Sequence, residues 1–276
     1  MSSHAVVARL RRILGEKKIG HGGTLDPMAR GVLPVFIGRA TRAAGEIQEG
    51  GKSYTADMRA GIRTDTQDTT GAVLESCGAV PTPEQVEAAL PLFRGEISQL
   101  PPMYSALSVD GVRLYRLARQ GIEVERQARS VKVYSLELAG VRENGDFVLS
   151  IDCSKGLYVR TLIDDLGRAL GCGAAMSALV RTRAGIFGID RALTLEQVEL
   201  LHASGQLADH IICADALFQK LESITADEKT AGRLKNGQHV PMPGAEDGLL
   251  RLYGSEGFIG IIAVKGGIAK IEKSFY

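Results

Sequence analysis

The stretch Gly20-His-Gly-Gly-Thr-Leu-Asp-Pro-Met-Ala-Arg-Gly-Val-Leu-Pro-Val-Phe-Ile-Gly-Arg-Ala-Thr41 places a glycine-dense loop directly before a hydrophobic run. The loop contains neither the G-x-x-x-x-G-K-[ST] pattern of a phosphate-binding loop nor the G-x-G-x-x-G pattern of a dinucleotide site, so it does not indicate nucleotide binding. Its acidic residue, Asp26, precedes a proline, and an Asp-Pro pair taken alone is more often a helix N-cap than a catalytic group. By itself, the stretch therefore predicts a loop that leads into a helix.

The chain as a whole has the composition of an ordinary globular protein. Of its 276 residues, 45% are hydrophobic and 24% are charged, which is enough apolar material for a sizeable core and excludes wholesale disorder. No apolar run approaches the roughly 18 residues that a membrane span needs. The four cysteines stand far apart, so we expect reduced, buried thiols in a cytoplasmic protein rather than a zinc site or disulfides. They are Cys77, Cys153, Cys172 and Cys213.

Positive charge is concentrated near the start of the chain. The net charge of the whole protein is only +1, but residues 1–42 hold eight Lys and Arg against two acids, a net charge of +6. A basic face on a near-neutral molecule can hold a polyanion. The alternative is a solvated helix face, and charge alone favours that alternative.

Hydrophobic periodicity predicts a mixture of helices and strands. Ser3 is expected to cap a helix that runs to about Leu14 and ends at Gly15, and alternation around Tyr54 predicts a strand. Further predicted elements are a helix with a capping box at Thr82, a hairpin at Asp110-Gly111, a strand over Phe147–Cys153, a helix over Tyr158–Leu170 and a helix capped at Thr194.

Two other regions have a distinct pattern. Arginines recur every three residues after the predicted hairpin, at Arg113, Arg116 and Arg119, and indicate a basic stripe on a short helix. From about residue 222 onward, short apolar runs alternate with glycine-rich turns, and this spacing predicts a small β-barrel appended to a mixed α/β domain.

Several polar groups have ordinary structural explanations when each is taken alone. The segment Asp65-Thr-Gln-Asp68 lacks the ligand spacing of a calcium loop and is interpreted as a turn held by its own side chains. Arg160 could pair with Asp164, four residues further along a helix. Tyr54 could be a core residue and His21 a loop donor. Only their combination points to a site.

Taken together, these segments closely resemble the TruB family, the tRNA pseudouridine-55 synthases. The signature loop quoted above carries the strongest likeness, and the resemblance runs nearly from end to end. The other matching segments, in chain order, are Lys52-Ser-Tyr54, Gly61-Ile-Arg-Thr-Asp-Thr-Gln-Asp-Thr-Thr-Gly71, Pro101-Pro-Met-Tyr-Ser-Ala-Leu107, Leu114-Tyr-Arg-Leu-Ala-Arg-Gln-Gly121, Cys153-Ser-Lys-Gly-Leu-Tyr-Val-Arg-Thr161, Gly171-Cys-Gly-Ala and Arg181-Thr-Arg.

The resemblance implies a fold and a domain order. It implies an α+β pseudouridine synthase fold, with a mixed, mostly antiparallel sheet flanked by helices. Residues 1–221 would form the catalytic domain, with a mobile thumb inserted at about residues 100–132. Residues 222–276 would form a PUA-type RNA-binding barrel.

The resemblance also implies roles for named residues. Asp26 would be the catalytic carboxylate, Arg160 its cationic partner, and Tyr54 the aromatic group that stacks on the target base and transfers a proton at C5. His21 would enter the space that the extruded base vacates, and Tyr158 would line the pocket below the uracil. The remaining implied substrate contacts are Gly22, Gly23, Thr24, Arg113, Arg116 and Arg119.

The chemistry implied is an isomerisation that needs neither a metal nor a redox cofactor. The C1′–N1 bond of uridine breaks and C1′ joins C5 of the same base. A carboxylate can attack C1′, attack C6, or remove the C2′ proton to give a glycal, and the sequence leaves all three routes open. Each route requires an ionised, aimed carboxylate, which a neighbouring guanidinium favours.

Two departures from the family pattern are visible. Family members usually begin with a strand and a Lys-Pro motif, whereas this chain starts at Met1-Ser-Ser-His4, so we expect an uncovered sheet edge. Ser108 stands where the thumb commonly carries a lysine, so we expect one phosphate contact fewer.

The expected partner is the T-loop and T-arm of tRNA, bound by a monomer that needs no other protein and no membrane. Two rival functions share these motifs. One is a guide-RNA-dependent synthase, which works with partner proteins; the other is a tRNA-binding folding factor without catalysis. The self-sufficient thumb disfavours the first, and the intact set of Asp26, Tyr54 and Arg160 disfavours the second.

Overall fold

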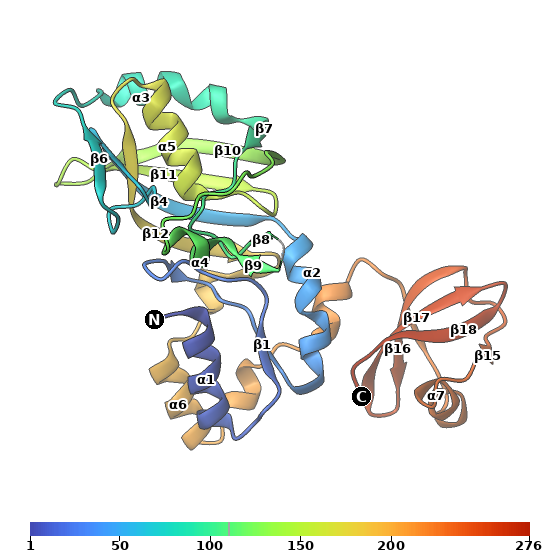
Figure 1. Ribbon diagram of the computed structural model, residues 1–276. Helices are drawn as coiled ribbons and strands as arrows, with labels where there is room; N and C mark the ends of the chain where they lie inside the picture. Colours follow the sequence, from blue (N-terminus) through green and yellow to red (C-terminus); the bar gives the residue numbers. More distant parts are fainter. Residues whose placement is uncertain (110) are drawn as a thin grey trace. The chain divides into compact units, whose positions relative to one another are not determined.

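The computed structural model describes residues 1–109 and 111–276, with Gln48 and Glu49 described by their backbone alone. The chain forms two compact units, and each is described by itself. We call residues 26–32 and 49–192 the sheet unit, and residues 1–25, 33–48 and 193–276 the terminal unit. Figure 1 shows the helices and strands of both.

A mostly antiparallel sheet forms the centre of the sheet unit. Its strand order is β13-β12-β4-β11-β10-β7, and β2 joins β12 as the one parallel strand pair described in this sheet. The strands are β2 (Arg30–Gly31), β4 (Lys52–Ala60), β7 (Gly95–Gln99), β10 (Arg129–Val141), β11 (Phe147–Cys153), β12 (Ala174–Ala184) and β13 (Phe187–Gly188). The predicted α+β class, the strand over Phe147–Cys153 and the strand around Tyr54 are confirmed.

The alternation of side chains along β4 separates a core face from a polar face. Tyr54, Ala56 and Met58 are buried, as a two-residue period requires. Helices α3 (Pro83–Ala89) and α5 (Val159–Ala169), with η2 (Leu90–Phe93), supply the apolar side chains that cover this core. The sheet and its helices therefore share one hydrophobic core. Figure 1 shows the ribbons of α5 and the strands of this sheet.

The residues that begin α3 and α6 and end α5 are those that the sequence predicted. Thr82 and Gln85 form a reciprocal capping box at the start of α3, and Thr194 and Gln197 form another at the start of α6 (Leu195–Ala203). Helix α5 ends where Gly171 takes a left-handed backbone, with φ of 71°.

Smaller elements of the sheet unit surround this core. They are the hairpin β5 (Ile62–Thr64) with β6 (Val73–Ser76), the pair β8 (Ser108–Val109) with β9 (Val112–Arg113), the helix α4 (Leu114–Ala118) and the 3₁₀ turn η3 (Ile189–Arg191). The β8–β9 pair is the hairpin predicted at Asp110-Gly111, although Asp110 lies outside the described residues.

The three arginines of the predicted basic stripe do not all lie within the observed helix. Helix α4 is only five residues long, so Arg113 and Arg119 lie at its two caps and Arg116 alone lies within it. All three side chains are exposed. The predicted short helix is confirmed, and Gly121, with φ of 70°, follows its C-cap two residues later.

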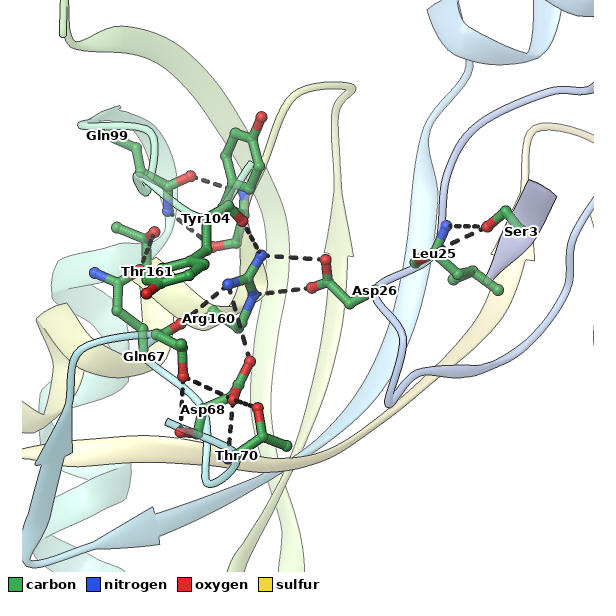
Figure 2. Close-up of polar contacts among 12 residues, drawn as sticks. Ser3, Leu25, Asp26, Gln67, Asp68, Thr70, Gln99, Tyr104, Arg160 and Thr161 are labelled. Carbon is green, nitrogen blue, oxygen red and sulfur yellow. Dashed lines mark hydrogen bonds and ion pairs between the residues drawn. The ribbon is translucent and has the colours of Figure 1, made fainter. Parts of the chain in front are cut away.

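The terminal unit begins with helix α1 (Ser3–Leu14), and the N-cap of this helix differs from the one predicted. Its N-cap is Ser2, whose hydroxyl accepts a hydrogen bond from the Ala5 amide, and not Ser3. Ser3 is buried, and its hydroxyl accepts from the Leu25 amide at 2.9 Å (Figure 2). Two adjacent serines offer the same capping group, and only the fold distinguishes them.

Among the described residues, the terminal unit contains seven further elements before its C-terminal part. They are β1 (Ile19–His21), β3 (Val35–Ile37), η1 (Gly38–Ala43), α2 (Ala44–Glu49), α6, η4 (Leu207–His210) and η5 (Ala214–Phe218). The apolar stripe of α1 packs on Ile19 and on Leu195 and Val198 of α6. The loop predicted from Gly20 thus begins as a strand, since β1 pairs with β3.

The C-terminal part of the terminal unit is a curled five-stranded sheet of half-barrel form. Its order is β14-β16-β17-β18-β15, and helix α7 (Glu228–Lys235) packs on it. The strands are β14 (Ser223–Thr225), β15 (Val240–Pro241), β16 (Gly248–Gly254), β17 (Gly257–Lys265) and β18 (Ile268–Ser274). The strands separated by glycine-containing turns lie in the region from about residue 222 onward, where the sequence predicted them.

The cysteine expectation is only half right. Cys153 and Cys172 are buried thiols, but Cys77 and Cys213 are exposed. The composition of the chain and the spacing of its cysteines do not indicate which cysteines other segments will bury. Among the described residues, no helix is both long and apolar enough to cross a membrane.

Two helical glycines make a test of the packing between α5 and the sheet. A Cβ at Gly167 would lie 2.1 Å from the Ala174 amide nitrogen, whereas a Cβ at Gly232 in α7 would meet nothing within 4 Å. We expect Gly167→Ala to lower the free energy of unfolding by about 1–3 kcal/mol or more through overpacking. Gly232→Ala should raise it by about 0.5–1 kcal/mol, because alanine favours helices. Thermal and urea unfolding of both variants measure this, and equal effects would contradict the close packing.

Candidate active site

Asp26 does not cap a helix. The residues after it form a turn that is closed by a hydrogen bond from the Ala29 amide to the Asp26 carbonyl at 2.9 Å. Its carboxylate instead accepts two hydrogen bonds from Arg160, at 2.9 Å from Nε to Oδ2 and at 3.1 Å from Nη2 to Oδ1 (Figure 2). This is the two-point geometry that makes an arginine–carboxylate pair strong and directional.

Arg160 is held far more tightly than its partner. Its side chain is only 5% exposed, while that of Asp26 is 34% exposed. Its Nη1 donates to the Thr66 carbonyl at 3.0 Å, and its Nη2 also donates to the Tyr104 carbonyl at 2.8 Å. The guanidinium therefore has a fixed orientation, and the carboxylate that it aims stays accessible from one side.

The start of α5 explains where Arg160 comes from. Tyr158 is the N-cap residue, and Arg160 is the second residue of the helix. The backbone of Tyr158 is fixed by Gln99, which accepts from its amide at 2.8 Å and donates to its carbonyl at 3.1 Å. The alternative pairing of Arg160 with Asp164 is wrong, because Asp164 binds Arg168 and Arg63.

A tight turn after β5 supports the far side of Arg160. Gln67 in this turn has φ of 63° and is the one non-glycine with positive φ in the described part of the chain. Its side chain accepts from the Thr161 hydroxyl at 2.7 Å, and its carbonyl accepts from the Met176 amide at 3.1 Å. These bonds offset the backbone strain and place the neighbouring Thr66 carbonyl against Arg160.

Asp68 closes the same turn, as the sequence predicted for a segment held by its own side chains. Its Oδ1 accepts from the Thr66 hydroxyl at 2.8 Å and from the Thr70 amide at 3.0 Å. Its Oδ2 lies 3.9 Å from Arg160 Nη1 (Figure 2). The sequence assigned no site role to Gln67 or Asp68. The feature that could have indicated them is the run of hydroxyl and carboxylate side chains in the same turn.

Tyr54 lies on the buried face of β4 and is 8% exposed. Burial raises the pKa of its phenol to about 12, although the hydrogen-bonded guanidinium of Arg181 opposes the rise. Arg181 stands opposite Tyr54 on β12 and is almost fully buried. Tyr54 is thus a neutral hydroxyl with a cation beside it at physiological pH.

Arg181 is a third site residue to which the sequence assigned no role. Its Nε donates to the Val32 carbonyl at 2.8 Å. The backbones approach so closely that a Cβ at Gly31, where φ is 97°, would lie 2.2 Å from the Arg181 carbonyl oxygen. Only glycine fits at position 31. The backbone of this part of the signature loop therefore packs directly against the strand that carries Arg181.

The charge of Asp26 affects the pKa of two phenols. It contributes to raising the pKa of Tyr54 and also that of Tyr158, although burial is the largest cause in both. The sheet unit therefore brings the carboxylate, its arginine and two neutral tyrosines within electrostatic range of one another.

Other predicted site residues lie elsewhere in the chain. His21, Gly22, Gly23 and Thr24 belong to the terminal unit, where the Gly23 amide donates to His21 Nδ1 at 3.4 Å. A Cβ at Gly22 would lie 3.0 Å from Phe36, so the loop packs closely on β3.

The three arginines around α4 make contacts within their own segment. Arg113 donates to the Ala106 carbonyl, and the guanidinium of Arg119 lies 5.6 Å from the centre of the Tyr115 ring. Arg116 helps to lower the pKa of Tyr115.

Metal binding has no geometric support among residues 1–109 and 111–276, where no three His, Cys, Asp or Glu side chains cluster at ligand distance. The donor group that binds Asp26 is the guanidinium of Arg160, and a cationic donor of this kind suits an anion rather than a metal cation.

Comparison with known proteins gives a consistent result. Residues 11–159 match the model described as "TruB family pseudouridylate synthase (N terminal domain)". Residues 160–219 match "tRNA pseudouridylate synthase B C-terminal domain", and residues 223–269 match "Pseudouridine synthase II TruB, C-terminal".

Curated relatives and solved structures extend these matches. A tRNA pseudouridine synthase B of Aromatoleum aromaticum is 45% identical over 95% of this chain and 84% of its own, and one of Ralstonia nicotianae is 41% identical over 99% and 90%. A chain in a Cbf5-Nop10-Gar1 complex superposes with a TM-score of 0.73 at 27% identity, covering all of this chain and 82% of its own.

The raised pKa of Tyr54 makes alkaline stability a test of the site. The unfolded phenol ionises near pH 10, and the folded one near pH 12, so its contribution to stability is present below pH 10 and is lost as pH rises from 10 to 12. We expect Tyr54→Phe to lose less stability than wild type over this interval. Urea unfolding at several pH values measures it, and parallel curves for the two proteins would show that Tyr54 ionises normally.

Proposed function

This chain belongs to the TruB family of pseudouridylate synthases, and we propose that it isomerises uridine 55 in the T-loop of tRNA to pseudouridine. The observation that carries this function is the two-point pair between Asp26 and Arg160. It joins the signature loop to a residue 134 positions away, at a carboxylate that stays accessible.

The reaction is balanced within the substrate. The C1′–N1 bond breaks, C1′ bonds to C5, the proton on C5 is removed and N1 ends protonated, so nothing is oxidised and no group departs. Asp26 begins this sequence as nucleophile at C1′ or C6, or as base at C2′. In each case Arg160 keeps the carboxylate ionised and aimed.

Tyr54 acts in this scheme on the base itself. Its ring stacks on the extruded uracil, and its hydroxyl relays the proton from C5. With a pKa of about 12 it is neutral when substrate arrives. The buried guanidinium of Arg181 beside it lowers the cost of any negative charge that the phenol acquires during the transfer.

Substrate binding requires the target base to leave the T-loop stack, at a cost of a few kcal/mol. His21 fills the vacated space, Tyr158 lines the pocket below the uracil, and the thumb at residues 100–132 closes over the RNA. The remaining binding residues in this proposal are Gly22, Gly23, Thr24, Arg113, Arg116 and Arg119.

The proposed organisation assigns residues 1–221 to catalysis and residues 222–276 to RNA binding by a PUA-like domain. The protein works in the cytoplasm as a monomer on tRNA alone. The exposed arginines of the thumb supply contacts that a self-sufficient enzyme needs.

A guide-RNA-dependent synthase is the second candidate, because the similar solved chains include one titled for an H/ACA RNP bound to a substrate RNA. The curated relatives favour the tRNA enzyme, since they are named for tRNA and are more similar in sequence. A folding factor without catalysis would have no need of an ionised acid beside a buried arginine.

The first test is modification of an unmodified tRNA transcript by purified protein. We expect wild type to convert one T-loop uridine without metal, guide RNA or accessory protein, as mapped by chemical probing for pseudouridine. Asp26→Asn should bind the transcript but be inert, because the amide can neither attack carbon nor remove a proton.

Each rival predicts a different outcome. Turnover only after addition of a guide RNA would support the guide-dependent enzyme, and tight binding without turnover by wild type would support the folding factor. Activity that survives in Asp26→Asn would remove Asp26 from its assigned role.

Salt dependence tests the electrostatic part of RNA binding. If the basic N-terminal residues and the thumb arginines contact phosphates, affinity for tRNA should fall steeply as salt rises, with a slope that shrinks by roughly one for each phosphate contact removed. Titrations at several salt concentrations for wild type and Arg116→Gln measure the slope. An unchanged slope would exclude Arg116 from the interface.

A further inference from the structure

Ser105 carries a buried hydroxyl that lacks a hydrogen-bond partner. The residue is 5% exposed, and its Oγ is one of two buried side-chain polar atoms for which the described residues provide no partner; the other is Nε of Arg126. Buried hydroxyl groups are nearly always paired, because an unpaired one costs about 1–3 kcal/mol. An exception of this kind needs an explanation.

The position of Ser105 is fixed by its backbone. Its amide donates to the Met103 carbonyl at 2.9 Å, and its carbonyl accepts from the Tyr115 amide at 3.1 Å. The preceding carbonyl, that of Tyr104, accepts from Arg160. Ser105 is thus held next to the residue whose carbonyl binds Arg160, within the segment proposed as the thumb.

The hydroxyl is also close to the proposed base pocket. Burial raises the pKa of Tyr158, but the nearby Ser105 hydroxyl lowers it, and Asp26 and Arg160 both act on the same phenol. The Ser105 hydroxyl therefore lies within reach of the Tyr158 phenol but makes no hydrogen bond of normal geometry with it, so it can turn toward another acceptor.

We propose that the Ser105 hydroxyl donates a hydrogen bond to a ring carbonyl oxygen, O2 or O4, of the extruded uracil, and so serves as a substrate-binding residue. The inference rests on the proposed function, which places the uracil against Tyr158. A neutral hydroxyl next to a neutral phenol suits an uncharged carbonyl better than a phosphate, which would require cationic donors.

This role has a consequence for the stability of the free protein. Because the hydroxyl makes no hydrogen bond of normal geometry, its removal should disturb the unliganded fold little. Ser105→Ala should therefore leave the melting temperature unchanged or raise it. A serine whose hydroxyl is paired behaves oppositely, and Ser177 is the matched control: its Oγ donates to Asp146 at 2.6 Å on the same unit.

The experiment compares kcat/KM for Ser105→Ala, Ser177→Ala and wild type on a T-arm stem-loop RNA. The target position carries uridine, 2-thiouridine or 4-thiouridine, since sulfur is a poorer acceptor than oxygen. We expect Ser105→Ala to lose about tenfold in kcat/KM on uridine with no loss of melting temperature. Ser177→Ala should lose melting temperature and keep its kcat/KM.

The sulfur substitutions identify the contact. One of the two thio substrates should slow wild type and should cost nothing further in Ser105→Ala, because the bond is already absent. Unchanged kcat/KM in Ser105→Ala, or thio effects of the same size in both proteins, would overturn the inference alone. An inactive wild type would overturn the proposed function and the inference with it.

Discussion

The two hydrogen bonds between Arg160 and Asp26 are the interaction on which the rest of the site depends. A buried guanidinium is costly unless its donors are satisfied, and here carbonyl groups from two further segments share the task with the carboxylate. The arginine cannot turn without breaking all of them. Asp26, with about a third of its side chain accessible, is therefore a carboxylate whose direction is set by Arg160 and which remains partly open to solvent.

The surrounding fold can be understood as the means of holding that arginine. The capping position of Tyr158 starts the helix at the right point, and Gln99 fixes that start from the sheet. A strained turn at Gln67 brings a carbonyl to the other side of the guanidinium. Strain and buried charge both lower stability, and the network of bonds around them is what allows a single native arrangement to persist. The same network makes the site rigid before any RNA is present.

Much of this could be predicted from the sequence, and the failures have physical causes. Capping boxes and two-residue alternation depend on neighbours in the chain, so the starts of α3 and α6 and the buried face of β4 were correct. Asp26 was different: local chemistry favours a cap, and only the family resemblance paired it with Arg160, because a contact across 134 residues leaves no local signal. The choice between Ser2 and Ser3 as cap, and the exposure of Cys77, failed for the same reason.

Ser105 and Gln67 illustrate two ways in which a site departs from the rules that stabilise the remainder of a protein. Gln67 breaks a backbone preference, but every polar group of its side chain is bonded, so its cost is balanced within the fold. The Ser105 hydroxyl is buried without a hydrogen bond of normal geometry, so the unliganded fold does not fully balance the cost of burying it. A cost that the protein alone does not offset is reasonable only where something else offsets it, and binding of substrate is the event that removes it. Gln67 is thus a residue that holds the site in place, whereas the Ser105 hydroxyl is proposed to complete its hydrogen bonding only when substrate binds.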